Sequence, residues 1–233
     1  MEIHWTKINR IIEETPEIRT YFLDCPKDFT WEAGAHTHFA LEGFNVGEKP
    51  NKSLVRHMSI STVPGETTIG ITTRVKEECS IFKETLRQSG IGQSVALFKT
   101  RNRLSLKRDS RTIYLLSSGV GLATFRPLVL DYFQDNHDIA HIHSLNVDST
   151  GDFLFTDVVA TDDDKNITAE FVTSRKDYYA ALEEIAKDQN GIFYIVGSDE
   201  FLVENIQVLK NNGIDGQQIV LDKHAHRVAE FLG

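Results

Sequence analysis

The apolar pattern of the chain changes near residue 107, and this change constrains the fold more than any other feature. Before it, short apolar runs follow one another between turn residues, as is typical of an antiparallel barrel or sandwich. After it, apolar strands alternate with segments of helical period, which predicts a parallel sheet covered on both faces. We therefore expect two domains, at 1–107 and 108–233, each large enough for its own core.

The first domain is predicted to be an antiparallel β-barrel with one inserted helix. Its strands are short apolar runs bounded by Gly and Pro, expected at 1–13, 18–23, 36–41, 54–60, 67–75 and 94–98. The helix is expected to begin with Ser80 as its N-cap and to end near Gly90, because Ser caps exposed N–H groups and Gly ends helices.

The second domain is predicted to be an α/β unit with a parallel sheet. Its strands are expected at 113–116, 139–145, 167–172, 192–196 and 219–221. Helices are expected at 123–133, at 178–185 and at 201–209, and the acidic run 162–164 is interpreted as a solvated loop.

Charge and cysteine content exclude several classes of function. The net charge of -9 argues against binding to nucleic acid or to anionic lipid. No apolar run is long enough to span a bilayer and the N-terminus lacks a secretory signal, so we expect a cytoplasmic protein. Cys25 and Cys79 are too few for a four-cysteine iron–sulfur site, so redox chemistry would need an organic cofactor.

Two glycine turns follow predicted strands of the second domain. Gly119 and Gly121 lie between the strand at 113–116 and a helix, and Gly197 follows the strand at 192–196. Glycines at such a turn let the backbone approach a pyrophosphate, which the helix N-terminus favours. A tight turn without a ligand is the alternative, but both turns should meet at the carboxyl edge of the sheet, where ligands bind.

Four segments resemble motifs of the ferredoxin–NADP reductase superfamily, and the resemblance spans nearly the whole chain. They are Arg56-His57-Met58-Ser59, Glu78-Cys79-Ser80, Gly119-Val120-Gly121-Leu122-Ala123-Thr124-Phe125 and Val196-Gly197-Ser198. The resemblance implies that Arg56 meets a flavin phosphate, that Ser80 caps a pyrophosphate-binding helix, and that Ser59 lies near the reactive flavin nitrogen. Ser59 is the expected catalytic residue, and Met58 replaces an aromatic residue of the family.

The resemblance also implies a site for the electron donor. Thr173-Ser174-Arg175-Lys176-Asp177-Tyr178-Tyr179 is similar to a segment whose serine and arginine bind the 2′-phosphate of NADP and whose tyrosine stacks on adenine. This favours NADPH over NADH. The segment Asp222-Lys223-His224 lies where the family often covers the flavin ring, a role for His224 or Phe231. The full set expected to bind cofactors is Arg56, His57, Met58, Ser59, Thr72, Cys79, Ser80, Gly119, Gly121, Leu122, Ser174, Arg175, Tyr178, Gly197 and His224.

The function implied is an NAD(P)H-dependent flavoprotein reductase. It would transfer a hydride from NADPH, or from NADH, to bound FAD, with FMN as the alternative flavin, and pass electrons to a flavodoxin, a ferredoxin or another acceptor. A free-flavin or ferric reductase is one alternative. Another is a flavin-binding electron-transfer or regulatory subunit, because Thr124, Val196 and Ser198 depart from the family pattern. The acceptor and the oligomeric state stay open.

Three His-x-His pairs stand apart from these motifs. They are His36/His38, His141/His143 and His224/His226, and on a strand each pair would point to one face. A metal site needs a third ligand and supporting partners, and the sequence identifies neither, so strand-face or surface histidines are the preferred interpretation.

Overall fold

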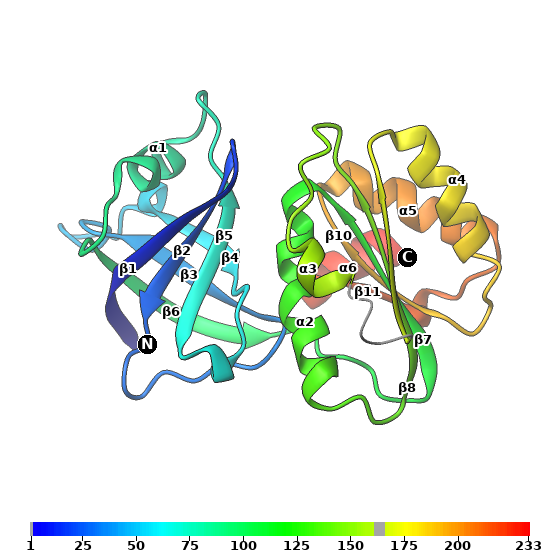
Figure 1. Ribbon diagram of the computed structural model, residues 1–233. Coiled ribbons are helices and arrows are strands. Elements are labelled where there is room, and N and C mark those ends of the chain that lie inside the picture. Colours follow the sequence, from blue (N-terminus) through cyan, green and yellow to red (C-terminus); the bar gives the residue numbers. More distant parts are fainter. Residues whose placement is uncertain (1, 161–165) are drawn as a thin grey trace. The chain divides into compact units, whose positions relative to one another are not determined.

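A computed structural model describes residues 2–160 and 166–233 and divides the chain into two compact units. They comprise Met1–Asn102 and Arg103–Gly233 (Figure 1). The acidic run that the sequence analysis placed in a loop lies outside the described residues.

The first unit contains six strands, one α-helix and two short 3-10 helices among its described residues. In chain order they are β1 (Ile3–Thr15), β2 (Ile18–Asp24), β3 (Ala35–Leu41), η1 (Lys52–Leu54), β4 (Val55–Ser59), η2 (Pro64–Glu66), β5 (Thr68–Arg74), α1 (Ile81–Gln88) and β6 (Ser94–Asn102). Each predicted strand is present, and α1 begins after Ser80, whose side chain accepts from the backbone N–H of Lys83.

The six strands form one curled antiparallel sheet in the order β4-β3-β6-β1-β2-β5. The curl brings the two end strands together, because the N–H of Ser61, just after β4, donates to the carbonyl of Gly70 on β5 at 2.8 Å. This confirms the predicted barrel architecture with one inserted helix.

The core of the first unit lies inside this curl. Tyr21, Phe39 and the helix residue Phe82 are fully buried there. Trp31 is 8% exposed and donates its indole N–H to the carbonyl of Thr62 at 2.9 Å. Trp5, on β1, is 44% exposed. Phe82 anchors α1 to the sheet and so fixes the position of the helix N-terminus.

The second unit alternates strands with helices. In chain order the elements are β7 (Arg111–Ser118), η3 (Gly119–Gly121), α2 (Leu122–Gln134), β8 (Ile139–Val147), α3 (Thr156–Val159), β9 (Ile167–Val172), α4 (Arg175–Ile185), β10 (Ile192–Val196), α5 (Asp199–Asn211), η4 (Gly216–Gln218), β11 (Ile219–Leu221) and α6 (Ala225–Leu232).

The five strands of the second unit are all parallel, in the order β11-β10-β7-β8-β9. Helices α2 and α3 lie on one side of the sheet, and α4 and α5 lie on the other (Figure 1). The buried strands are nearly continuous apolar runs, as expected when both faces are covered. The predicted α/β architecture is confirmed.

Two helices were not expected from the sequence. The first, α3, has only four residues, too few to show a helical period. The second, α6, follows His224, which is its N-cap residue. His224 and His226 therefore lie at the start of a helix and not on a strand, whereas the other two His-x-His pairs lie on β3 and β8. Within residues 2–160 and 166–233, none of the helices combines the length and hydropathy needed to cross a bilayer.

Candidate functional site

Arg56 lies on β4 beneath helix α1. Its Nη1 atom donates to the carbonyl of Val55 at 2.7 Å and to that of Lys52 at 3.4 Å. Its guanidinium carbon is 5.3 Å from the centroid of the Phe82 ring, at the first turn of α1. These contacts hold the guanidinium beside the helix N-terminus while the residue stays partly exposed. A planar, permanently charged fork in this position suits a phosphate group.

The N-terminus of α1 carries the segment expected to meet a pyrophosphate. The Ser80 hydroxyl accepts from the N–H of Lys83 at 3.5 Å, so Ser80 is the N-cap, and it is exposed. Cys79 is also exposed, with its thiol 3.9 Å from a carboxylate oxygen of Glu84. The first N–H groups of a helix have no partner within it and carry the positive end of its dipole. Arg56 and this terminus thus lie beside each other, in an arrangement that suits an anion.

Lys83 adds a second positive charge that sequence reasoning missed. Its ammonium donates to the Thr73 hydroxyl and, at 2.7 Å, to the carbonyl of Arg74. Burial lowers the pKa of Lys83 to about 8; the nearby Cys79 raises it, and the positive charge of Arg56 lowers it further. All three residues lie at or beside the first turn of α1. In the sequence Lys83 looks like any lysine on an exposed helix face.

Met58 and Ser59 lie on opposite sides of β4. Met58 is partly buried and packs against the core of the first unit. Side chains two residues apart on a strand lie on the same face, so Met58 shares its face of β4 with Arg56. Ser59 pairs with His36 across the sheet. Met58 therefore offers a thioether at the rim of the core, where a soft side chain can contact an aromatic ring.

His57 and Thr72 belong to two polar clusters of the same sheet. The ring of the exposed His57 is 4.1 Å from that of His36 and 5.3 Å from that of His38, between centroids. Thr72 binds the hydroxyls of Ser61 and Thr20, at 2.8 Å each. Across the part of the chain that the structure describes, no three His, Cys, Asp or Glu side chains gather in a way that could hold a metal ion.

The first glycine turn of the second unit is packed against the second. Gly119 has a φ of +53°, which glycine adopts without strain. A Cβ atom on Gly121 would lie 2.8 Å from the carbonyl oxygen of Val196, at the end of β10. Helix α2 begins at once, at Leu122, whose side chain is buried and whose N–H donates to the carbonyls of Gly119 and Val120. The structure therefore brings Gly121 and the turn at Gly197 together.

Gly197 and Ser198 form the second turn and open helix α5. A Cβ atom on Gly197 would lie 2.4 Å from the Phe201 ring, so only glycine fits there. The Ser198 hydroxyl accepts from the N–H of Phe201 at 3.2 Å and is the N-cap of α5. Ser198, which departs from the family pattern, thus has a structural reason of its own. At Gly121 and at Gly197, the space that a side chain would need is already filled by Val196 and by Phe201.

The segment expected to bind the donor's ribose lies at the end of β9 and the start of α4. Ser174 is the N-cap of α4, and its hydroxyl donates to a carboxylate oxygen of Asp177 at 2.6 Å. Arg175 is the first helical residue and is 52% exposed. Its Nη1 atom lies 3.0 Å from a carboxylate oxygen of Glu204, on α5. The two residues assigned to a 2′-phosphate already bind carboxylates.

Tyr178 does not lie where an adenine can stack. It is fully buried between the sheet and α5, and its hydroxyl donates to the side-chain oxygen of Asn205 at 2.6 Å. Burial makes the assignment of Tyr178 to adenine wrong. Tyr179, the next residue, is only partly buried and donates its hydroxyl to Glu204 beside Arg175. The sequence does not distinguish Tyr178 from Tyr179 as the residue that could stack on adenine. Their difference in burial becomes visible only in the packed structure.

His224 and Phe231 differ in accessibility. His224 is exposed, and its Nδ1 atom is 2.8 Å from a guanidinium nitrogen of Arg103. Phe231 packs against the core of the second unit, with the guanidinium carbon of Arg227 5.6 Å from its ring centroid. Of the two residues considered for covering a flavin, His224 is the more exposed, and Phe231 is partly buried.

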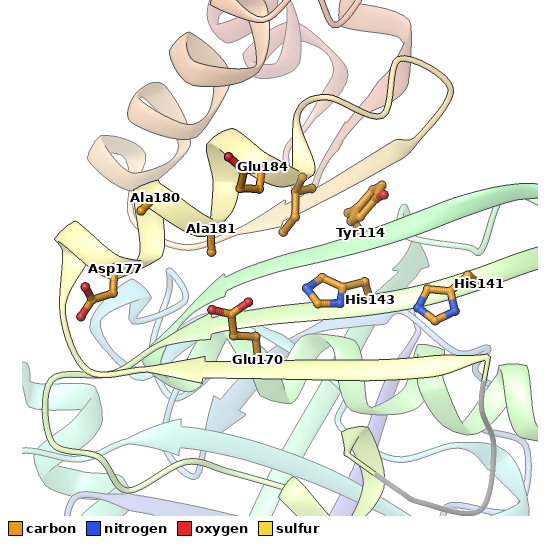
Figure 2. Close-up of a pocket in the computed structure, with 9 residues that line it drawn as sticks. Tyr114, His141, His143, Glu170, Asp177, Ala180, Ala181 and Glu184 are labelled. Atoms are coloured by element: carbon orange, nitrogen blue, oxygen red, sulfur yellow. The ribbon is translucent and has the colours of Figure 1, made fainter.

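A groove of about 660 Å³ runs along α4 on one face of the parallel sheet (Figure 2). Its floor carries Tyr114, His141 and His143, and both imidazoles reach the Thr168 hydroxyl at 2.8 Å. Burial, and then the charge of His141, lower the pKa of His143. Asp177, which lines the groove, accepts a hydrogen bond from the Ser174 hydroxyl of the predicted set.

Comparisons with known proteins bear on the fold. No protein-family model and no curated protein matches the sequence. A ferredoxin NADP+ reductase from Neisseria gonorrhoeae, solved with FAD and NADP, superposes with a TM-score of 0.80 at 15% identity, covering 95% of this chain and 98% of that one. The chain has the ferredoxin–NADP+ reductase fold.

Other structures with this fold extend the comparison. The Plasmodium falciparum ferredoxin-NADP+ reductase in complex with 2′P-AMP gives a TM-score of 0.77 at 13% identity, covering 94% of this chain and 95% of that one. The CS-b5R domains of human Ncb5or, in their NAD+ form, give 0.76 at 15% identity, covering 95% of this chain and 70% of that one. Both units of the chain thus have counterparts in the ferredoxin–NADP+ reductase fold.

Proposed function

We propose that this protein is an NAD(P)H-dependent flavoprotein reductase. The observation that carries the proposal is the cluster of Arg56 and Lys83 beside the N-terminus of α1. Two positive charges and exposed helix N–H groups form a receptor for a diphosphate. In the Neisseria reductase the same fold was solved with FAD and NADP, which agrees with this assignment.

FAD suits the first unit better than FMN. A pyrophosphate is longer and carries more acceptor oxygens than a single phosphate, so it can accept from charged donors on two elements at once. Arg56 on the sheet and Lys83 on the helix supply partners from two elements, with Ser80 beside them. Met58 would contact the flavin ring from the rim of the core. We therefore propose that residues 1–107 form the FAD-binding domain, with Ser59 near the reactive nitrogen.

The second unit is proposed to bind the nicotinamide dinucleotide. The turn from Gly119 to Gly121 and the turn at Gly197 meet at the carboxyl edge of the sheet, where nucleotides bind in such folds. Ser174 and Arg175 favour NADPH as the donor, because a hydroxyl and a guanidinium suit a 2′-phosphate. Residues 108–233 would then form the donor-binding domain.

The residues of this chain bind and orient more than they react. When bound, the nicotinamide and the flavin supply the transfer of hydride and electrons. Arg56 and Lys83 would neutralise the flavin diphosphate, and Ser59 would donate a hydrogen bond to a ring nitrogen. The glycine turns admit the donor's pyrophosphate close to backbone N–H groups. The proposed acceptor is another redox protein, such as a ferredoxin or a flavodoxin.

An anaerobic visible spectrum of the protein loaded with FAD tests the proposal. Addition of NADPH or NADH should bleach the visible absorption of the bound flavin. An Arg56→Ala variant should bind FAD at least about 10-fold more weakly, because a charged phosphate contact is lost. A wild-type protein that binds flavin but is reduced by neither donor would point to an electron-transfer subunit. Failure to bind any flavin would refute the proposal.

A further inference from the structure

Arg175 is held by two carboxylates of helix α5. Its Nη1 atom is 3.0 Å from an oxygen of Glu204, and its Nη2 atom is 3.7 Å from an oxygen of Glu200. Glu200 and Glu204 are one helical turn apart and present their carboxylates to the same guanidinium. Glu204 is the nearer and the less exposed of the two, at 37% against 70%. Glu204 is therefore the main partner of Arg175.

Tyr179 fixes the same carboxylate from the next turn of α4. Its hydroxyl donates to the Glu204 oxygen that Arg175 binds. Burial and this hydrogen bond to Glu204 raise the pKa of Tyr179 well above its usual range, so the phenol stays protonated as a donor. Two donors from α4 thus hold one oxygen from α5. A carboxylate held in this way cannot turn aside as readily as a lone surface glutamate.

The surroundings of Arg175 are acidic on balance. Arg175 and Lys176 bring two positive charges, whereas Asp177, Glu200 and Glu204 bring three negative charges. The Ser174 hydroxyl is also engaged, by Asp177. An incoming dianion would have to compete with carboxylates for both of its expected partners. A ribose with a 2′-hydroxyl would meet no such competition, because a carboxylate accepts a hydrogen bond from it.

We propose that Glu204 is a specificity-determining residue that opposes the 2′-phosphate of NADPH and so moves the donor preference toward NADH. The inference rests on the proposed function, since it assumes that the second unit binds a nicotinamide dinucleotide. By itself, Arg175 would favour binding of the 2′-phosphate. Glu204 weakens this preference, because its carboxylate already binds the guanidinium and repels the negative charge of the phosphate. The alternative role, in which Glu204 orients Arg175 for the phosphate, makes the opposite prediction for its removal.

The test compares adenosine 5′-monophosphate with adenosine 2′,5′-bisphosphate, which differ only in the 2′-phosphate. Calorimetric titration of the full-length protein with each probe needs no turnover. Glu204→Gln should raise the ratio of the association constants, bisphosphate over monophosphate, by about 3- to 10-fold at low salt, because one repulsive charge a few ångströms away is removed. The gain should shrink as salt is added. Steady-state kcat/KM for NADPH over NADH should shift in the same direction.

Matched variants separate the outcomes. Glu183→Gln also removes one negative charge, but from a carboxylate of α4 that binds Asn212 and not Arg175. This variant should leave the ratio of the two association constants unchanged. Tyr179→Phe releases one donor from Glu204 and should raise the ratio by less than Glu204→Gln. If the wild-type protein binds the monophosphate but the ratio stays constant or falls in Glu204→Gln, the role given to Glu204 is wrong and the proposed nucleotide site still stands. Wild-type protein that binds neither probe refutes the nucleotide site and the inference with it.

Discussion

Lys83 should make the affinity of the protein for FAD depend on pH. Its pKa is lowered to about 8, with burial as the main cause. The ammonium is thus mostly present at pH 7 and mostly lost at pH 9. A diphosphate binds the charged form, so the dissociation constant for FAD should rise by up to about 10-fold between pH 7 and pH 9. Flavin fluorescence quenching measures this directly, and Lys83→Met should flatten the difference.

The flavin-free protein should show the opposite trend. Unfolded Lys83 keeps its proton up to its ordinary pKa of 10.5, whereas the folded residue loses it near 8. Between these values the unfolded state binds more protons, so the contribution of Lys83 to the free energy of unfolding rises with pH. Urea unfolding of wild type and Lys83→Met at pH 7 and pH 9 checks the sign. A wild-type difference equal to that of the variant would contradict the pKa shift.

Individual roles were less predictable than residue types. Arg56 and Ser80 were identified from their motifs and do lie beside one helix terminus. Lys83 was missed because its burial depends on the contact of α1 with β5, which no local pattern reveals. Glu204 was missed for a related reason, since its partner Arg175 lies far away in the sequence.

At the scale of elements, the contact between the two glycine turns leaves no room for a side chain on Gly121. Gly121→Ala would place a Cβ atom 2.8 Å from the backbone oxygen of Val196, and backbone cannot rotate away. We expect the free energy of unfolding to fall by about 1–3 kcal/mol, measured by urea denaturation, because over-packing forces α2 from β10. Weaker binding of the donor nucleotide should accompany this loss.

A glycine elsewhere in the same unit provides the control. A Cβ atom on Gly216 would meet only the Leu232 side chain, at 3.9 Å, an ordinary contact. Gly216→Ala should therefore change the free energy of unfolding by less than about 1 kcal/mol. Equal losses in both variants would show that the close approach of Gly121 to Val196 is not the cause.

Elements with a strong period were predictable and short or terminal ones were not. The strands at 167–172, 192–196 and 219–221 were predicted with the bounds that the structure has. Continuous apolar runs between turn residues made this possible. The helix α6 escaped because its apolar residues, which include Phe231, follow two histidines that suggested a strand face. Val228 and Phe231 of α6 pack against the core of the second unit, and Asp199 pairs with Lys223 and Arg227; only the tertiary structure shows these contacts.

At the scale of the whole molecule, the segment between the units belongs to the second one. The Tyr194 hydroxyl, on β10, donates to the carbonyl of Ser105 at 2.8 Å and accepts from the N–H of Lys107 at 2.9 Å. Arg103 adds its contact with His224. The sequence pattern changes at residue 107, but these bonds fasten the preceding residues to the sheet.

Truncation tests this attachment. A fragment of residues 108–233 loses both partners of the buried Tyr194 hydroxyl, whereas a fragment of residues 103–233 keeps them. We expect the shorter fragment to be less stable by at least about 2 kcal/mol in urea unfolding, because it loses both hydrogen bonds to Tyr194 and the buried side chains of Leu104 and Leu106. Fragments of equal stability would show that the segment contributes nothing to the second unit.

The positions of the two tryptophans make intrinsic fluorescence a specific probe of the first unit. Both Trp5 and Trp31 lie in the first unit, and the chain has no others. Trp31 is enclosed in the core and bonded to Thr62, whereas Trp5 is partly exposed, so their emission should differ in colour. Five of the six tyrosines lie in the second unit. Excitation at the red edge of the protein absorption band therefore reports on the first unit, and its unfolding can be followed in the intact chain without a dye.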